Sequence, residues 1–123
     1  MHAAIVAHAR RDAPDECCGF LLGADDAVDE ACPARNLTRS PTRFLVDPED
    51  HFAAIHRARA TGRAVRAVYH SHPSGPPRPS ASDAAEMRDP ELIYVIVSLA
   101  PEVTVSAWQW VEERFVEVRL VVS

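Results

Sequence analysis

The order of the expected helices and strands constrains the fold of this 123-residue chain more than any single motif does. Helical patterns are expected over residues 2–12, from residue 48 to about residue 61, and from about residue 80. Strand patterns are expected over residues 17–22, in one or two irregular stretches within 24–43, and over 64–72, 92–99, 103–110 and 114–121. Three helices are too few to supply a crossover for every parallel pair of strands. The order therefore predicts an α+β fold in a single domain, with a mixed, mainly antiparallel sheet flanked by helices.

The second helix carries the clearest start signals in the chain. Asp47 is suited to the N-cap and Pro48 to the first helical position. Phe52 and Ile55 are expected to form its core-facing side, and Gly62 is placed to end it.

Charge and composition exclude several classes of function. The chain has 18 acidic and 13 basic residues, a net charge of −5, and every basic residue is Arg. Without Lys, neither a Schiff base on Lys nor a P-loop Lys is possible. The acidic balance argues against a nucleic-acid partner, because nucleic acid usually binds a basic face.

The cysteines and the hydropathy pattern indicate a cytoplasmic protein without a membrane association. Three cysteines, two of them adjacent at Cys17 and Cys18, do not suit the disulfide framework of a small secreted domain. No run approaches the roughly 18 consecutive apolar residues of a membrane span, and the N-terminus lacks the layout of a signal peptide. We therefore expect a reducing compartment.

The chemistry of the chain is concentrated in residues 69–83, Y-H-S-H-P-S-G-P-P-R-P-S-A-S-D. His70 and His72 are two residues apart at the end of a predicted strand, so their imidazoles leave the same face of the sheet. Asp83 follows a proline-stiffened loop and lies in the first turn of the third helix. Two His and one carboxylate would leave a tetrahedral Zn²⁺ with an open fourth position, as in catalytic sites.

Each of these residues also has an ordinary structural interpretation. A His pair at a strand end is often polar surface, and Ser80 with Asp83 forms a common S-x-x-D helix start. Glu16, before an apolar strand, would ordinarily be a solvated loop acid. The His-x-Glu and P-C-x-x-C signature of zinc deaminases is absent, which disfavours nucleobase deamination.

Taken together, these residues resemble the JAB1/MPN/Mov34 (JAMM) metalloprotease family. The spacing of His70, His72, Ser80 and Asp83 matches its metal-site motif, and E-C-C-G-F-L-L-G at residues 16–23 is similar to the segment that carries its catalytic Glu. The resemblance implies a cytidine-deaminase-like architecture in which His70, His72 and Asp83 hold Zn²⁺. It further implies that Glu16 acts as general base and then general acid, and that Ser80 donates a hydrogen bond to the oxyanion.

The resemblance also implies a class of substrate. Members of the family hydrolyse amide or isopeptide bonds after the C-terminal Gly-Gly of ubiquitin or ubiquitin-like proteins. The opening stretch I-V-A-H-A-R-R-D-A-P-D-E-C-C-G is similar to that of small prokaryotic peptidases that act on sulfur-carrier proteins. Two alternatives stay open: a non-catalytic MPN-type module that binds a partner protein, and a RadC-like member of the same superfamily.

Several expectations concern residues outside the motif. Cys18 alternates with Glu16 and could lie close to the metal, although a packed apolar role is favoured. Trp108 and Trp110 share one face of a late strand, as core or interface residues. A sheet edge beside the metal would take an extended tail by strand addition, with the proline-rich loop 73–79 as one wall. The remaining histidines are expected to be exposed or partly packed: His2, His8, His51 and His56.

Overall fold

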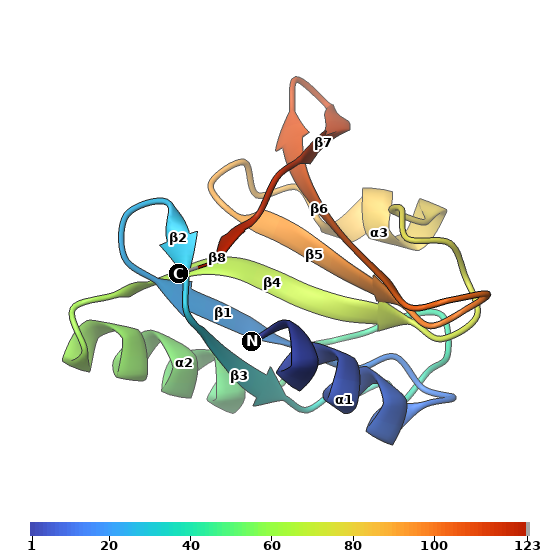
Figure 1. The fold of residues 1–123 in the computed structure, drawn as a ribbon, viewed down its shortest axis with the longest axis horizontal. Coiled ribbons are helices and arrows are strands. Elements are labelled where there is room, and N and C mark those ends of the chain that lie inside the picture. Colours follow the sequence, from blue (N-terminus) through green and yellow to red (C-terminus); the bar gives the residue numbers. More distant parts are fainter. Residues whose placement is uncertain (123) are drawn as a thin grey trace.

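The computed structural model describes residues 1–122, over which the chain forms three helices and eight strands (Figure 1). The helices are α1 (His2–Asp12), α2 (Pro48–Ala60) and α3 (Ala81–Glu86). The strands are β1 (Cys18–Gly23), β2 (Ala27–Val28), β3 (Glu30–Ala34), β4 (Ala64–His72), β5 (Ile93–Ser98), β6 (Thr104–Val111), β7 (Arg114–Val118) and β8 (Val121–Val122). The expected last strand is thus divided into β7 and β8.

The main sheet has the strand order β3-β1-β4-β5-β6-β7 over the described residues. β4 and β5 are parallel, and every other neighbouring pair in this sheet is antiparallel. β2 and β8 form a separate small parallel pair. The expectation of an α+β fold with a mixed, mainly antiparallel sheet flanked by helices is confirmed.

Two hydrophobic clusters pack on opposite faces of the sheet. The helix α1 contributes Ile5, Val6 and Ala9 to one cluster, against inward side chains of the central strands. The second cluster receives Ala54 and Ala58 from α2 and also contains Met87, at the end of α3. The strand β4 therefore runs through the middle of a helix–sheet–helix arrangement, which fixes the position of its C-terminal residues.

The start of α2 is as expected, but its buried face is not. Asp47 accepts a hydrogen bond from the backbone N–H of Glu49 at 2.9 Å and caps the helix ahead of Pro48. Phe52 was expected in the core and is 75% exposed, so that expectation is wrong. The residues buried from α2 are the two small ones, Ala54 and Ala58, which allow the helix backbone to approach the sheet closely.

One of the four remaining histidines also contradicts its expectation. His8 is 4% exposed, and its Nδ1 lies 2.7 Å from the hydroxyl of the fully buried Tyr69. Its Nε2 lies 3.2 Å from Asp12. Burial lowers the pKa of His8, against the raising effect of Asp12. The other three are exposed, as expected: His2, His51 and His56.

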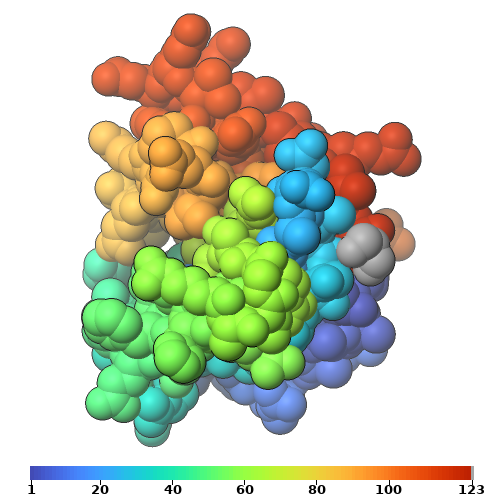
Figure 2. Space-filling model, turned by 90° about the vertical axis from the view of Figure 1, so that its left-hand side faces the viewer, coloured from blue at the N-terminus to red at the C-terminus, as the bar shows by residue number. Residues whose placement is uncertain are grey.

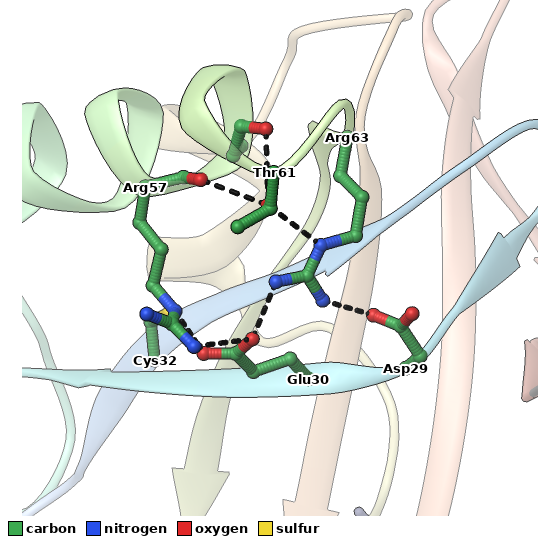
Figure 3. A network of polar contacts seen from close by, with 7 residues as sticks. Asp29, Glu30, Cys32, Arg57, Thr61 and Arg63 are labelled. Carbon is green, nitrogen blue, oxygen red and sulfur yellow. Dashed lines mark hydrogen bonds and ion pairs between the residues drawn. The ribbon is translucent and has the colours of Figure 1, made fainter.

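Ion pairs fasten α2 and the following turn to the outer strand β3 (Figure 3). Arg57 and Arg63 both pair with Glu30, and Arg63 also pairs with Asp29. The hydrogen bonds from Arg57 and then from Arg63 lower the pKa of Glu30 to about 2. This network holds the edge of the sheet to the helix that covers it.

The β6–β7 hairpin forms the top of the molecule in Figure 2, with α2 below it. Trp108 and Trp110 are half-buried on this hairpin, and Trp110 packs against Phe115 with Arg88 over its ring. Over residues 1–122 no helix has both the length and the apolar composition needed to cross a membrane.

Candidate metal centre

The last residues of β4 and the first turn of α3 bring three buried ligand groups to one point. His70 is 0% exposed, His72 6% and Asp83 4%. The two Nε2 atoms are 3.1 Å apart, and they lie 3.1 and 3.0 Å from Oδ2 of Asp83. The structure thus brings together the three side chains that the sequence singled out as candidate metal ligands. Within residues 1–122 they form the single group of His, Cys, Asp and Glu side chains with metal-binding geometry.

The spacing of the three ligand atoms suits a small cation. A tetrahedral ion with bonds of about 2.0–2.1 Å separates its ligand atoms by about 3.3–3.4 Å. His72 donates its Nδ1–H to the carbonyl oxygen of Pro76 at 2.7 Å, so in the neutral ring Nε2 carries a lone pair. That lone pair faces a carboxylate oxygen, which is unfavourable unless a cation or a proton lies between them. The donor set therefore fits a divalent ion such as zinc.

Ser80 and Asp83 fulfil their structural role and present a ligand at the same time. Ser80 Oγ accepts from the Asp83 N–H at 3.1 Å, and Asp83 Oδ2 accepts from the Ser80 N–H at 2.9 Å. This reciprocal pair is a capping box at the start of α3. Because the Ser80 hydroxyl accepts there, its own proton stays available for another acceptor.

Charge and burial perturb all three ligand groups. Burial would raise the pKa of Asp83, but its close contacts with the imidazoles of His70 and His72 and with the backbone N–H of Ser80 hold it well below its usual range. Burial lowers the pKa of His70, whereas the pKa of His72 is raised because Asp83 and the Pro76 carbonyl outweigh burial. His70 also stacks on Phe44, with ring centroids 4.5 Å apart.

Glu16 lies beside this cluster with its carboxyl out of solvent. The residue is 3% exposed, and Oε1 has no hydrogen-bond partner within residues 1–122. Burial raises the pKa of Glu16 to about 8, with His72 opposing the shift and Asp83 adding to it. A carboxyl group whose pKa lies near neutrality is suited to both accepting and donating a proton.

A cavity of about 360 Å³ opens in front of these groups. Glu16, His72 and Ser80 line it, together with Pro41 and Thr42 and with most of residues 74–79. The proline-rich loop, which was expected to form one wall of a groove for a substrate tail, lines this cavity. The expected sheet edge is not found here, because β4 lies between β1 and β5.

Glu16 also borders a second hollow of about 940 Å³ between the end of α1 and the segment after β3. Its lining is mostly charged and includes Arg11, Arg39 and Asp15, together with Asn36. This hollow is larger than the first, but its lining includes none of His70, His72 and Asp83, so the smaller cavity is the candidate site.

The two adjacent cysteines are packed core residues. Cys18 was expected close to the metal cluster, and it pairs with His70 in the β1–β4 register. Burial raises the pKa of Cys17 to about 11 and that of Cys18 to about 12, and both are fully buried. Neither thiol is therefore poised to ionise, in agreement with the packed role that the sequence favoured.

Two neighbours of the site carried no sequence signal for it. Asn36 was part of a turn-rich stretch, and its amide reaches the backbone of Glu16, 20 residues away. Phe44 belonged to a short apolar run, and its contact with His70 spans β4 and a distant loop. Both contacts join segments far apart in the sequence, which pattern and spacing do not reveal.

Comparison with known proteins gives one family match and several relatives. Residues 1–111 match the family described as prokaryotic homologs of the JAB domain. The chain is 33% identical over 126 residues to a desampylase of Haloferax volcanii, covering 97% of this chain and 89% of the relative. It is 36% identical over 97 residues to the CysO-cysteine peptidase of Mycobacterium tuberculosis, covering 77% of this chain and 66% of the relative.

Solved structures share the fold. A protein of Desulfitobacterium hafniense matches with a TM-score of 0.88 at 34% identity, covering 98% of this chain and 87% of that one. A JAMM structure described as a metalloprotease-like zinc site in the proteasome and signalosome matches with a TM-score of 0.59. At 23% identity, over 99% of this chain and 90% of that one, this second likeness concerns the fold alone.

Proposed function

Because the chain belongs to the family of prokaryotic homologs of the JAB domain, a family that includes peptidases, we propose that it is a zinc-dependent JAMM peptidase or isopeptidase. The bond cleaved is the amide after the C-terminal Gly-Gly of a ubiquitin-like or sulfur-carrier protein. The observation that carries the proposal is the convergence of His70, His72 and Asp83 beside the buried carboxyl of Glu16 in one cavity.

His70, His72 and Asp83 are proposed to hold Zn²⁺. A zinc ion bound there supplies Lewis-acid polarisation of the scissile carbonyl and lowers the pKa of a water molecule to about 7. The Pro76 carbonyl fixes the tautomer of His72 that leaves Nε2 free for the metal. The capping box holds the Asp83 carboxylate in place at the start of α3.

Glu16 is proposed to move the proton. It removes a proton from water as the water oxygen adds to the carbonyl carbon. It then returns this proton to the amine nitrogen as the C–N bond breaks, which gives a carboxylic acid and an amine. Its low exposure and raised pKa support both steps, because general acid–base catalysis is most efficient with a pKa near the working pH.

Ser80 is proposed to stabilise the oxyanion. Its hydroxyl lines the cavity and accepts from the Asp83 backbone, so its proton points to a different acceptor. Loss of one such donor typically lowers kcat about a hundredfold to a thousandfold.

The proposed substrate tail lies in the cavity lined by residues 41–42 and by most of residues 74–80. The relatives named as a desampylase, a CysO-cysteine peptidase and a probable TtuB-conjugate cleaving protease support a small carrier protein as partner. The free thiols of Cys17, Cys18 and Cys32 suit a reducing compartment, and we place the reaction in the cytoplasm.

The test uses a carrier protein ending in Gly-Gly, fused through an amide to a short peptide. The purified protein should contain about one zinc per chain and cleave after the second Gly. Glu16→Gln should keep the zinc and lower kcat about a hundredfold to ten-thousandfold. Glu102→Gln, which changes an exposed acid, serves as the matched control. Full activity in Glu16→Gln would refute the role of the carboxyl, and carrier binding without zinc or cleavage would indicate the alternative binding module.

A further inference from the structure

We infer that Asn36 is a positioning residue that holds Glu16 and the neighbouring wall of the cavity as one unit, an inference that rests on the proposed function of Glu16. Asn36 follows β3 and lies outside the metal cluster. Its side chain makes five hydrogen bonds, all to the Glu16 backbone or to residues 38–45.

The orientation of the Asn36 amide follows from its partners. Oδ1 accepts from the backbone N–H of Thr38 and of Leu45, each at 3.0 Å, and from the Thr38 hydroxyl at 2.7 Å. Backbone N–H groups can only donate, so this end of the amide must be the oxygen. Nδ2 then donates to two backbone carbonyls, that of Glu16 at 3.0 Å and that of Arg43 at 3.1 Å.

These bonds join the catalytic segment to the cavity wall. The residues that Asn36 ties together, 38–45, include Pro41 and Thr42, which line the cavity together with the proline-rich loop. The same segment returns a bond to Glu16, whose N–H donates to the Ser40 carbonyl at 2.8 Å. Glu16 is therefore held on both of its peptide groups by one loop, and Asn36 closes that loop.

The need for such a clamp follows from where Glu16 lies. It precedes β1, so no strand pairing fixes it directly. Its carboxyl has an unpaired oxygen, so the side chain does not anchor itself there. Displacement of a catalytic group by about 1 Å can lower a rate about a hundredfold. The two hydrogen bonds to the Glu16 backbone therefore determine where its carboxyl lies.

The experiment compares Asn36→Asp with Thr38→Val. Asn36→Asp preserves the acceptor oxygens for Thr38 and Leu45 but removes both donors to the Glu16 and Arg43 carbonyls. Thr38→Val removes a bond to the same Oδ1 and leaves the bond to Glu16 intact. In the zinc-loaded protein, Asn36→Asp should lower kcat about 10- to 100-fold with a KM change below about threefold and unchanged zinc content. Thr38→Val should stay within about threefold of wild type.

A second measurement separates this inference from the proposed function. Hydrogen exchange of the Glu16 amide, followed by NMR without substrate, should be at least tenfold faster in Asn36→Asp than in wild type and unchanged in Thr38→Val. Unchanged exchange, or a kcat within threefold of wild type, overturns the inference. An inactive wild-type protein counts against the proposed function, and the exchange comparison still decides the role of Asn36. If Asn36→Asp does not fold, kcat and the exchange of the Glu16 amide are measured on Asn36→Ser instead. The Ser side chain is shorter than that of Asn and carries a single hydroxyl donor.

Discussion

The buried carboxyl of Glu16 should destabilise the metal-free protein at neutral pH, and Glu16→Gln should relieve this. The pKa of Glu16 rises from 4.5 to about 8 on folding, mainly through burial. Each tenfold difference between the acid constants of the folded and unfolded states corresponds to about 1.4 kcal/mol. The upper bound is therefore about 5 kcal/mol above pH 8 and about 3 kcal/mol at pH 7, and relaxation around the group reduces the expected gain at pH 7 to about 1–3 kcal/mol.

The sign of the effect defines its pH window. Below pH 4.5 both the folded and the unfolded state carry the proton, so the carboxyl contributes little to the difference between them. Between pH 4.5 and about 8 the unfolded state releases the proton while the folded state retains it, so the free energy of unfolding falls as pH rises. Above about pH 8 the difference in the free energy of unfolding between wild type and Glu16→Gln should become constant.

Urea unfolding in the presence of a chelator, at half-unit steps from pH 4.5 to 9, measures this difference. Glu16→Gln should unfold at the same urea concentration as wild type near pH 4.5 and at a higher one near pH 8. Glu102→Gln should follow wild type at every pH. Addition of zinc should narrow the gap, because a dication beside the carboxylate favours its ionised form. If the urea midpoints of wild type and Glu16→Gln do not differ, or if their difference does not grow with pH, the assignment of Glu16 as a carboxyl held out of solvent is refuted.

Three further predictions concern the metal cluster, the ion-pair network and the packing behind the cluster. Asp83→Asn should weaken zinc binding at least tenfold in a chelator competition, because it removes the anionic member of the proposed ligand set. Glu30→Gln should lower the free energy of unfolding by about 1–2 kcal/mol at pH 7, and the difference should vanish as pH falls from 4.5 to about 2, where Glu30 gains its proton, as followed by urea unfolding. Gly19→Ala should lower the free energy of unfolding by about 1–3 kcal/mol in the same assay, because the added Cβ would overlap the ring of buried Tyr69. A urea midpoint equal to that of wild type would show that this ring can move aside.

The parts of the fold predicted from the sequence are those determined locally. The start of α2 depends on Asp47 and Pro48, which act within one turn, and the structure has both in the expected positions. The buried face of α2 depends instead on what the sheet can accommodate. The sheet accepts Ala54 and Ala58 and leaves the much more hydrophobic Phe52 in solvent. The hydrophobic pattern therefore predicted the helix correctly but assigned the wrong residues to its buried face.

The same distinction applies to the histidines. His70 and His72 could be assigned to one face because a strand alternates its side chains, a local rule. His8 lies three residues after Ile5, on the buried face of α1, but the helix period does not say whether a polar side chain there finds a partner. Its burial depends on the Tyr69 hydroxyl, 61 residues away, and on Asp12 one turn later. The spacing of residues along the sequence does not reveal that a polar side chain is buried against a partner so far away.

The two halves of the candidate site are held by different means, and this determines how each will respond to mutation. His70 and His72 belong to an inner strand, and Asp83 is fixed by a capping box over residues 80–83. Glu16 depends on two bonds to a loop: Asn36 donates to its carbonyl, and its own N–H donates to the Ser40 carbonyl. It also depends on Cys17, whose N–H donates to Ser71 Oγ at 2.8 Å. Loop contacts open more readily than an inner strand. Substitutions that break the bond from Asn36 to Glu16 should therefore lower catalysis before they lower metal affinity, whereas substitutions in β4 should affect both together.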